Sequence, residues 1–180
     1  MHPRIAELID YVAAQRLALL DAVESVPEGE RDLRVSPDRW SVAEVLEHLH
    51  RVESGVARLF AKSVERARAA GIAQERETSS LLGSLDSYGL TRKARRLPAP
   101  DLVAPRGEYD AAQAIEALSA SRQALLTVVR EADGLALCQI SFPHPLLGSL
   151  NLYQWVLFVG QHEARHADQI QEIGRGTRAQ

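Results

Sequence analysis

The chain has 180 residues, of which 46% are hydrophobic and 25% are charged, so it is long enough to bury one sizeable core. Its formal net charge of -3 is too small to give either the basic field of a nucleic-acid-binding protein or a disordered acidic tail. We expect a single domain over residues 1–180, with no nucleic-acid partner.

The cysteine content and the N-terminal segment indicate where the protein works. Cys138 is the only cysteine, so an internal disulfide is impossible and a reducing compartment is favoured. Charged residues interrupt the apolar positions of the stretch MHPRIAELIDYVAAQRLALL, which excludes both a signal-peptide core and a membrane span there. We therefore expect a cytoplasmic protein without a membrane partner.

Four segments carry apolar residues at helical spacing, and no segment shows sustained strand-like alternation, which predicts an all-α protein. The first helix is expected from about Pro3 to Ser25. The second begins after Ser41, because Glu44 three residues later completes a capping-box pattern, and it runs to the break at Gly71.

The region from about Ile72 to Glu108 is rich in Gly, Pro and Ser and loses the helical period. It is longer than a compact antiparallel connection requires. A linker of this length could cross the bundle and make the second and third helices parallel neighbours. It contains a basic cluster, RKARR, which we interpret as a solvated loop in preference to a phosphate-binding patch.

The third helix is expected from about Asp110 to Ala132, with Asp110 as its N-cap. After the loop SFPHPLLGSL, a fourth helix begins at Asn151, where Gln154 occupies the capping-box position, and it is expected to end at Gly174. Together these elements predict a four-helix bundle with a long crossover between its second and third helices.

Histidines on the second and fourth helices are the candidate metal ligands. His162 and His166 are four residues apart, so they share one helix face about 40° apart, in the same sector as the apolar Trp155 and Val159. Burying two imidazoles is unfavourable unless they find partners, and a metal ion satisfies several ring nitrogens together. His48 lies at the margin of the apolar stripe of the second helix and can supply a third ligand.

Three neutral imidazoles suit Zn²⁺ or Ni²⁺, with Fe²⁺ as a further option, and they leave coordination positions for water or substrate. The alternative for a lone buried histidine is a hydrogen bond to a carbonyl or carboxylate, but an inward-facing pair favours the metal. His50 lies two residues from His48 and is expected to be solvated. His144, between two prolines, is better explained as part of a turn than as part of the site mouth.

The string His162-Glu163-Ala164-Arg165-His166 also matches the H-E-x-x-H template of zinc peptidases. We disfavour a peptidase, because only Glu172 remains downstream to offer a further ligand. Glu163 is still the candidate catalytic residue, as a group behind the metal ligands or a proton acceptor, with a surface carboxylate as the alternative reading.

The segments WSVAEVLEHLHRVE and PHPLLGSLNLYQWVLFVGQHEARHADQI resemble the DinB-like (DinB/YfiT) superfamily of metalloenzymes, over about Ser36 to Ile173. The specific part is the tryptophan before a helix that carries one histidine, followed by H-x3-H-x2-Q in the last helix. The resemblance implies a four-helix bundle with metal ligands at His48, His162 and His166, and it places the family's trailing glutamine at Gln169.

The resemblance also carries expectations about activity. Characterised relatives transfer low-molecular-weight thiols such as bacillithiol or act as mycothiol-dependent isomerases, and many are homodimers; the family name does not imply DNA binding. Several members carry an extra histidine directly before the last ligand, where this chain has Arg165, a departure that bears on the thiol-transferase assignment but not on the ligands.

The expected function is therefore a metal-dependent transferase of the thiol S-transferase type, or a hydrolase, acting on a small molecule. In either case the ion would lower the pKa of a bound water or substrate thiol. The alternative is a non-catalytic, stress-related helical bundle that binds a metal or another ligand.

Overall fold

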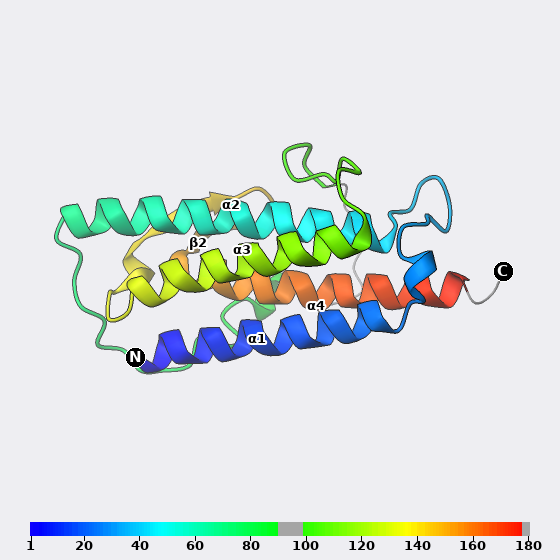
Figure 1. The fold of residues 1–180 in the computed structure, drawn as a ribbon. Coiled ribbons are helices and arrows are strands. Elements are labelled where there is room, and N and C mark those ends of the chain that lie inside the picture. The colour runs from blue at the N-terminus through cyan, green and yellow to red at the C-terminus, as the bar shows by residue number, and fades with distance from the viewer. Residues whose placement is uncertain (90–98, 178–180) are drawn as a thin grey trace.

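A computed structural model of the chain describes residues 1–89 and 99–177 and shows a four-helix bundle (Figure 1). The basic cluster RKARR lies outside the described residues. The elements in chain order are α1 (Pro3–Glu24), η1 (Glu28–Glu30), α2 (Val42–Ala69), η2 (Asp86–Tyr88), α3 (Ala111–Glu131), η3 (Leu137–Gln139), β1 (Ser141–His144), β2 (Gly148–Asn151) and α4 (Leu152–Thr177).

Reciprocal side-chain caps fix the starts of three of the helices. In each cap, one side chain accepts a hydrogen bond from the backbone N–H three residues ahead, while the side chain there accepts one from the first residue's N–H. The pairs are Ser41 with Glu44, Asp110 with Gln113, and Asn151 with Gln154. The predicted helix starts are therefore confirmed.

The predicted end of α4 at Gly174 is wrong, because the helix continues to Thr177. Gly174 does not adopt the positive φ with which a glycine usually ends a helix. The added turn also packs on the segment after α1, since a Cβ built on Gly176 would lie 3.2 Å from Val35. Tertiary packing thus extends the helix beyond its local stop signal.

The four helices pack as two parallel pairs. In Figure 1, α1 and α4 run side by side in one direction, and α2 and α3 run side by side in the other. The chain leaves α2 at one end of the bundle and enters α3 at the opposite end, which confirms the long crossover and the parallel arrangement of these two helices. The core contains two apolar clusters, one with Leu8 and Phe60 and the other with Leu19 and Leu46, and buried polar side chains also lie within the bundle.

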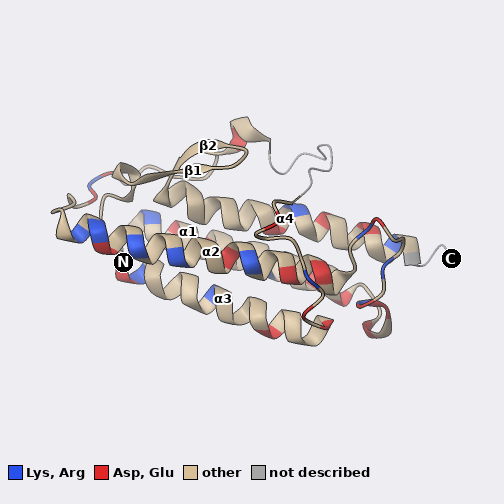
Figure 2. Cartoon of the chain, turned by 90° about the horizontal axis from the view of Figure 1, so that it is seen from above, with Lys and Arg blue, Asp and Glu red and all other residues tan. Residues whose placement is uncertain are grey.

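The predicted loop SFPHPLLGSL instead forms an antiparallel hairpin, in which Phe142 of β1 lies opposite Leu150 of β2. Figure 2 shows the hairpin beside α4, and neither strand carries a charged residue. Its strands are too short for periodicity to reveal, and Gly148, with φ +76°, provides a backbone conformation suited to the turn. Leu150 is completely buried, so the hairpin covers part of the core.

Among residues 1–89 and 99–177, none of the helices combines the length and the apolar character that a membrane span needs.

Candidate metal centre

The structure brings together the three histidines that the sequence singles out, which we call the histidine triad: His48 from α2, and His162 and His166 from α4. The Nε2 atom of His162 lies 3.3 Å from that of His48 and 3.1 Å from that of His166. One ligand atom from each residue lies within 4.8 Å of the other two. The side chains of two helices therefore converge on one small volume.

Aromatic side chains wall this volume. The ring of Trp40 lies 5.1 Å from that of His48, and Phe158 stacks on His162 with centroids 5.2 Å apart. His48 and His166 are only 4% and 7% exposed, whereas His162 is partly exposed. The surroundings are thus largely dry, and His162 is the member closest to solvent.

Hydrogen bonds at Nδ1 fix the tautomers of two triad members. His48 Nδ1 lies 2.8 Å from the carbonyl oxygen of Val103, and His166 Nδ1 lies 2.8 Å from Oε1 of Gln169. Carbonyl and amide oxygens only accept hydrogen bonds, so both Nδ1 atoms carry the proton and both Nε2 atoms keep a lone pair. Gln169, the expected trailing glutamine, therefore orients one of the candidate ligands.

All three imidazoles are held in the neutral form. Burial lowers the pKa of His48 and lowers the pKa of His166 to about 3. The pKa of His162 falls well below its ordinary value because of burial and the two neighbouring imidazoles. Neutral imidazole is the form that binds metals. The Nε2 atoms of His48 and His166 can only accept, and both lie against His162 Nε2. A single proton on His162 Nε2 can be donated along one of these directions, so it satisfies one of the two acceptors and not both.

The donor set fits one divalent ion. Two nitrogens at the usual Zn–N distance of about 2.0–2.1 Å and at a tetrahedral angle are about 3.3 Å apart. The two Nε2 separations at His162, 3.3 and 3.1 Å, match this spacing. Nitrogen-only sites of this kind suit Zn²⁺, Ni²⁺ and Fe²⁺. A cation at this point would meet all three lone pairs together.

Glu163, the candidate catalytic residue, lies in a buried ion cluster. The side chain is 1% exposed, so the alternative prediction of a surface carboxylate is wrong. Its Oε1 accepts a 2.7 Å hydrogen bond from Arg16 Nε, and its Oε2 accepts one of 2.7 Å from Arg122 Nη2. The carboxylate faces α1 and α3 and is held there by two guanidinium groups, which argues against a role as proton acceptor for the triad and against the peptidase template.

The other two internal histidines lie outside the triad. His50 Nδ1 is 2.9 Å from the carbonyl oxygen of Ala117, so the ring joins α2 to α3; as predicted it is not a ligand, but it is half-buried instead of fully solvated. His144 Nδ1 accepts from the backbone N–H groups of residues 146–147, which confirms its part in the turn. Its ring also lies 4.5 Å from that of Phe158, next to the aromatic wall.

Sequence reasoning missed Val103, whose backbone carbonyl fixes the tautomer of His48. It lies in the long linker, and no side-chain motif marks a carbonyl that acts in this way. Only the fold reveals this role, because it places the linker residue Val103 against His48 of α2.

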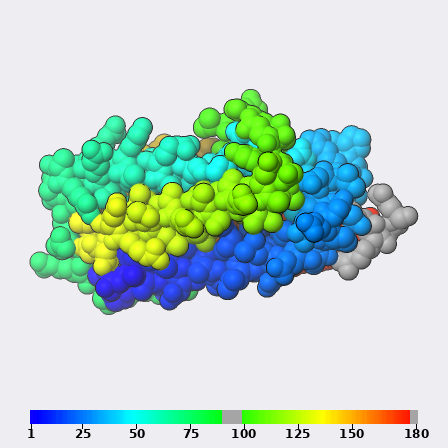
Figure 3. All heavy atoms as spheres, in the orientation of Figure 1, coloured from blue at the N-terminus to red at the C-terminus, as the bar shows by residue number. Residues whose placement is uncertain are grey.

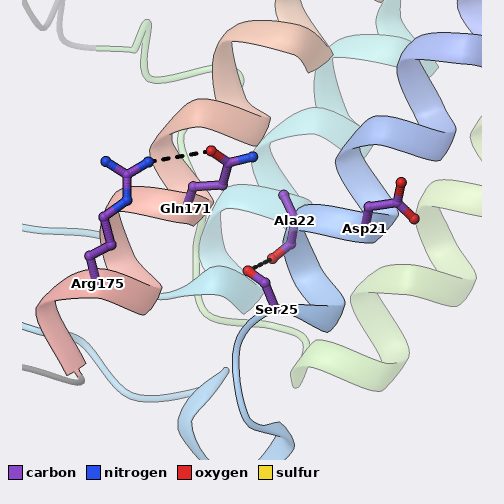
Figure 4. A pocket seen from close by; sticks show the side chains of 5 residues that line it. All are labelled: Asp21, Ala22, Ser25, Gln171 and Arg175. Carbon is purple, nitrogen blue, oxygen red and sulfur yellow. Dashed lines mark hydrogen bonds between the residues drawn. The ribbon is translucent and has the colours of Figure 1, made fainter.

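A separate pocket lies between the ends of α1 and α4, lined by Asp21, Ala22, Ser25, Gln171 and Arg175 (Figure 4). Its polar groups bond to one another: Arg175 donates to Gln171 at 3.4 Å, and the Ser25 hydroxyl donates to the carbonyl oxygen of Ala22 at 2.7 Å. None of the triad lines this pocket, and we assign no function to it.

Comparison with known proteins places the chain in a family. The sequence model of the DinB superfamily matches residues 11–170, a region that contains the whole triad. The chain belongs to the DinB superfamily. It is 27% identical over 165 residues to the Bacillus subtilis (strain 168) uncharacterized protein YuaE, covering 88% of this chain and 91% of that protein.

A solved structure supports the fold independently of the sequence match. The crystal structure of TT2238, described as a four-helix bundle protein, aligns with 93% of this DinB-superfamily chain and 98% of its own, with a TM-score of 0.61. At 19% identity this likeness concerns the fold alone. The predicted family and bundle architecture are both confirmed.

Proposed function

We propose that this DinB-superfamily protein binds one divalent metal ion through the Nε2 atoms of the histidine triad and uses it to act on a small molecule. The reaction would be a transfer of the thiol S-transferase type or a hydrolysis. The observation that carries the proposal is the pair of imidazoles, His48 and His166, whose Nδ1 protons are already donated and whose Nε2 lone pairs converge on His162. Zn²⁺ and Ni²⁺ are the first candidates, followed by Fe²⁺.

When bound, such an ion supplies Lewis acidity, which lowers the pKa of a thiol or a water. The residues of the chain do the rest. Val103 and Gln169 hold two of the imidazoles in one tautomer, and the rings of Trp40 and Phe158 keep the site dry. The partial exposure of His162 supports approach of a small molecule, such as a low-molecular-weight thiol, from its side.

Elemental analysis of the purified protein tests the metal site. We expect about one metal ion per chain in the wild type and in His50→Ala, the control, because His50 shares α2 with His48 but bonds to α3. The metal should be lost in His48→Ala and His162→Ala. A wild type without metal, even after reconstitution with Zn²⁺, Ni²⁺ and Fe²⁺, would contradict the proposal.

Turnover tests the catalytic part. The metal-loaded wild type and His162→Ala are compared on a panel that pairs low-molecular-weight thiols with electrophiles and includes simple esters. We expect turnover that needs both the metal and the triad. Stoichiometric metal without turnover on any panel would favour the non-catalytic binding protein, an alternative consistent with the near-complete burial of two of the three rings.

The proposal includes a homodimer in the cytoplasm. Dimerisation rests on the family resemblance, and an exposed, unpaired Cys138 suits a reducing compartment. Gel filtration at micromolar concentration checks the oligomeric state, and a single monomeric peak would contradict the dimer.

A further inference from the structure

The segment that leads into α3 lies over α2, which is the helix that carries His48. Figures 1 and 3 show this green segment standing above α2. We call residues 103–108 the strap. The strap contacts three residues of α2. The carbonyl oxygen of Val103 meets His48 Nδ1 at 2.8 Å, and the other end of the strap meets Glu47. The side chain of Glu108 also accepts a 2.8 Å hydrogen bond from Arg51.

Glu47 holds the strap through three consecutive backbone amides. Its Oε1 accepts from the N–H of Arg106 at 2.9 Å, and its Oε2 accepts from those of Gly107 at 2.9 Å and Glu108 at 3.3 Å. The side chain of Arg51, one turn along α2, donates to Oε1 at 2.8 Å. Glu47 is completely buried, and a buried carboxylate is tolerated only when its oxygens are satisfied in this way.

The conformation of the strap is specific to this contact. Gly107 adopts a φ of +69°, in the left-handed region that favours glycine. Successive amides in such a turn can face one anion together. Val103 is three residues before the first of these amides, so anchoring the strap at Glu47 also restricts where the Val103 carbonyl can lie.

We infer that Glu47 is a positioning residue, which holds the strap so that the Val103 carbonyl keeps the proton of His48 on Nδ1 and its Nε2 lone pair in the site. The inference rests on the proposed function in taking His48 as a ligand. Without the strap, His48 can rotate or carry its proton on Nε2, and in that tautomer Nε2 has no lone pair for a metal. Loss of such an outer partner typically costs about 10- to 100-fold in metal affinity.

The test compares Glu47→Gln with Glu44→Gln in the full chain. Gln has the shape of Glu but turns an NH₂ group toward amide donors. Glu44 lies one turn earlier on α2, where its carboxylate bonds to Arg34 and to the cap residue Ser41 instead of the strap, so the same substitution there is the matched control.

Three readouts separate positioning from general stability. We expect Zn²⁺ affinity, measured by chelator competition, to fall about 10- to 100-fold in Glu47→Gln and to stay unchanged in Glu44→Gln. In the metal-free protein, ¹⁵N NMR should show a larger Nε2–H population for His48. Amide hydrogen exchange at residues 106–108 should accelerate in Glu47→Gln but not in Glu44→Gln.

Gly107→Ala breaks the same contact from the other side. Its new Cβ meets nothing within 4 Å, but the positive φ strains the strap while Glu47 stays in place. We expect the same three changes, smaller in size. This variant also decides the matter if Glu47→Gln fails to fold.

Failure of the inference is distinguishable from failure of the proposed function. If the wild type binds Zn²⁺ and both strap variants bind it as tightly, with the His48 tautomer unchanged, the positioning role is overturned. If the wild type binds no metal, the proposed function fails, and the tautomer and exchange measurements on the metal-free protein still support or overturn the coupling between Glu47 and His48.

Discussion

Two buried polar clusters lie side by side in this bundle, and α4 contributes adjacent residues to them. His162 belongs to the histidine triad, whereas Glu163 belongs to an ion cluster that it forms with Arg16, Glu53 and Arg122. A step of about 100° around the helix separates the two side chains and sends them to different neighbours. The ion cluster is complete within the protein, whereas the triad has more acceptors than donors.

The bonds of the ion cluster show this completeness. Two guanidinium groups face two carboxylates, with Arg122 Nε 2.5 Å from Glu53 Oε1 and Arg16 Nη2 2.9 Å from Glu53 Oε2. The Nη1 group of Arg122 donates to the carbonyl oxygen of Val12, and that of Arg16 donates to the carbonyl oxygen of Leu118. No outside ligand is needed here, so we assign a structural role to the ion cluster, whereas the proposed metal-binding role belongs to the triad.

Glu163→Gln is expected to have the largest effect on stability and none on the metal. Removing one charge leaves Arg16 and Arg122 without a full counter-charge in a buried place, which costs about 3–5 kcal/mol of unfolding free energy. Urea denaturation measures the loss, with Glu116→Gln, exposed on α3, as the control. Loss of metal stoichiometry in folded Glu163→Gln would break the division between the two clusters.

Metal removal should act on the triad alone. If free metal is at about 100 times its Kd, the bound ion stabilises the fold by about 2.7 kcal/mol, and a chelator removes that contribution. We expect the chelator to lower the melting temperature of the wild type and of Glu163→Gln but not of His162→Ala. A chelator effect that persists in His162→Ala would place the metal elsewhere.

The sequence predicted the triad better than it predicted the ion cluster. Two histidines four residues apart on an apolar face already imply a shared partner. Burying two imidazoles is unfavourable unless their ring nitrogens find partners, and one metal ion can satisfy both. Glu163 carried no such signal, since its partners Arg16 and Arg122 lie on other helices and only the tertiary packing brings them together. The capping residues gave the helix starts because capping is local, and the end of α4 was missed because tertiary packing decides it.

Gly160→Ala tests the packing of α4 against α1, away from the triad. A Cβ built on Gly160 would lie 2.5 Å from the ring of Tyr11, so the two helices must separate or the ring must move. Overpacking of this kind costs about 1–3 kcal/mol. Thermal or urea unfolding should show the loss at unchanged metal content. Gly55→Ala, whose Cβ would meet nothing within 4 Å, is the control and should not destabilise the protein.

The two clusters should also respond to acid with opposite signs. Burial and the neighbouring His48 lower the pKa of His166 to about 3 in the folded protein, whereas an unfolded histidine titrates near its ordinary 6.5. Between these values the unfolded chain binds more protons, so stability that is fully present above pH 6.5 is lost as the pH falls. Burial raises the pKa of Glu163 above its ordinary value, so protonation there favours the folded state instead.

Urea denaturation of the metal-free protein between about pH 5 and 7 isolates the histidine contribution, since most unfolded carboxylates titrate below this range. Each histidine that stays neutral only when folded contributes a slope of up to about 1.4 kcal/mol per pH unit. His166→Gln should therefore lose less stability on acidification than the wild type, and its curve should be flatter. Parallel curves for the two proteins would mean that His166 is protonated as readily in the fold as outside it, which would remove the electrostatic distinction between the triad and the ion cluster.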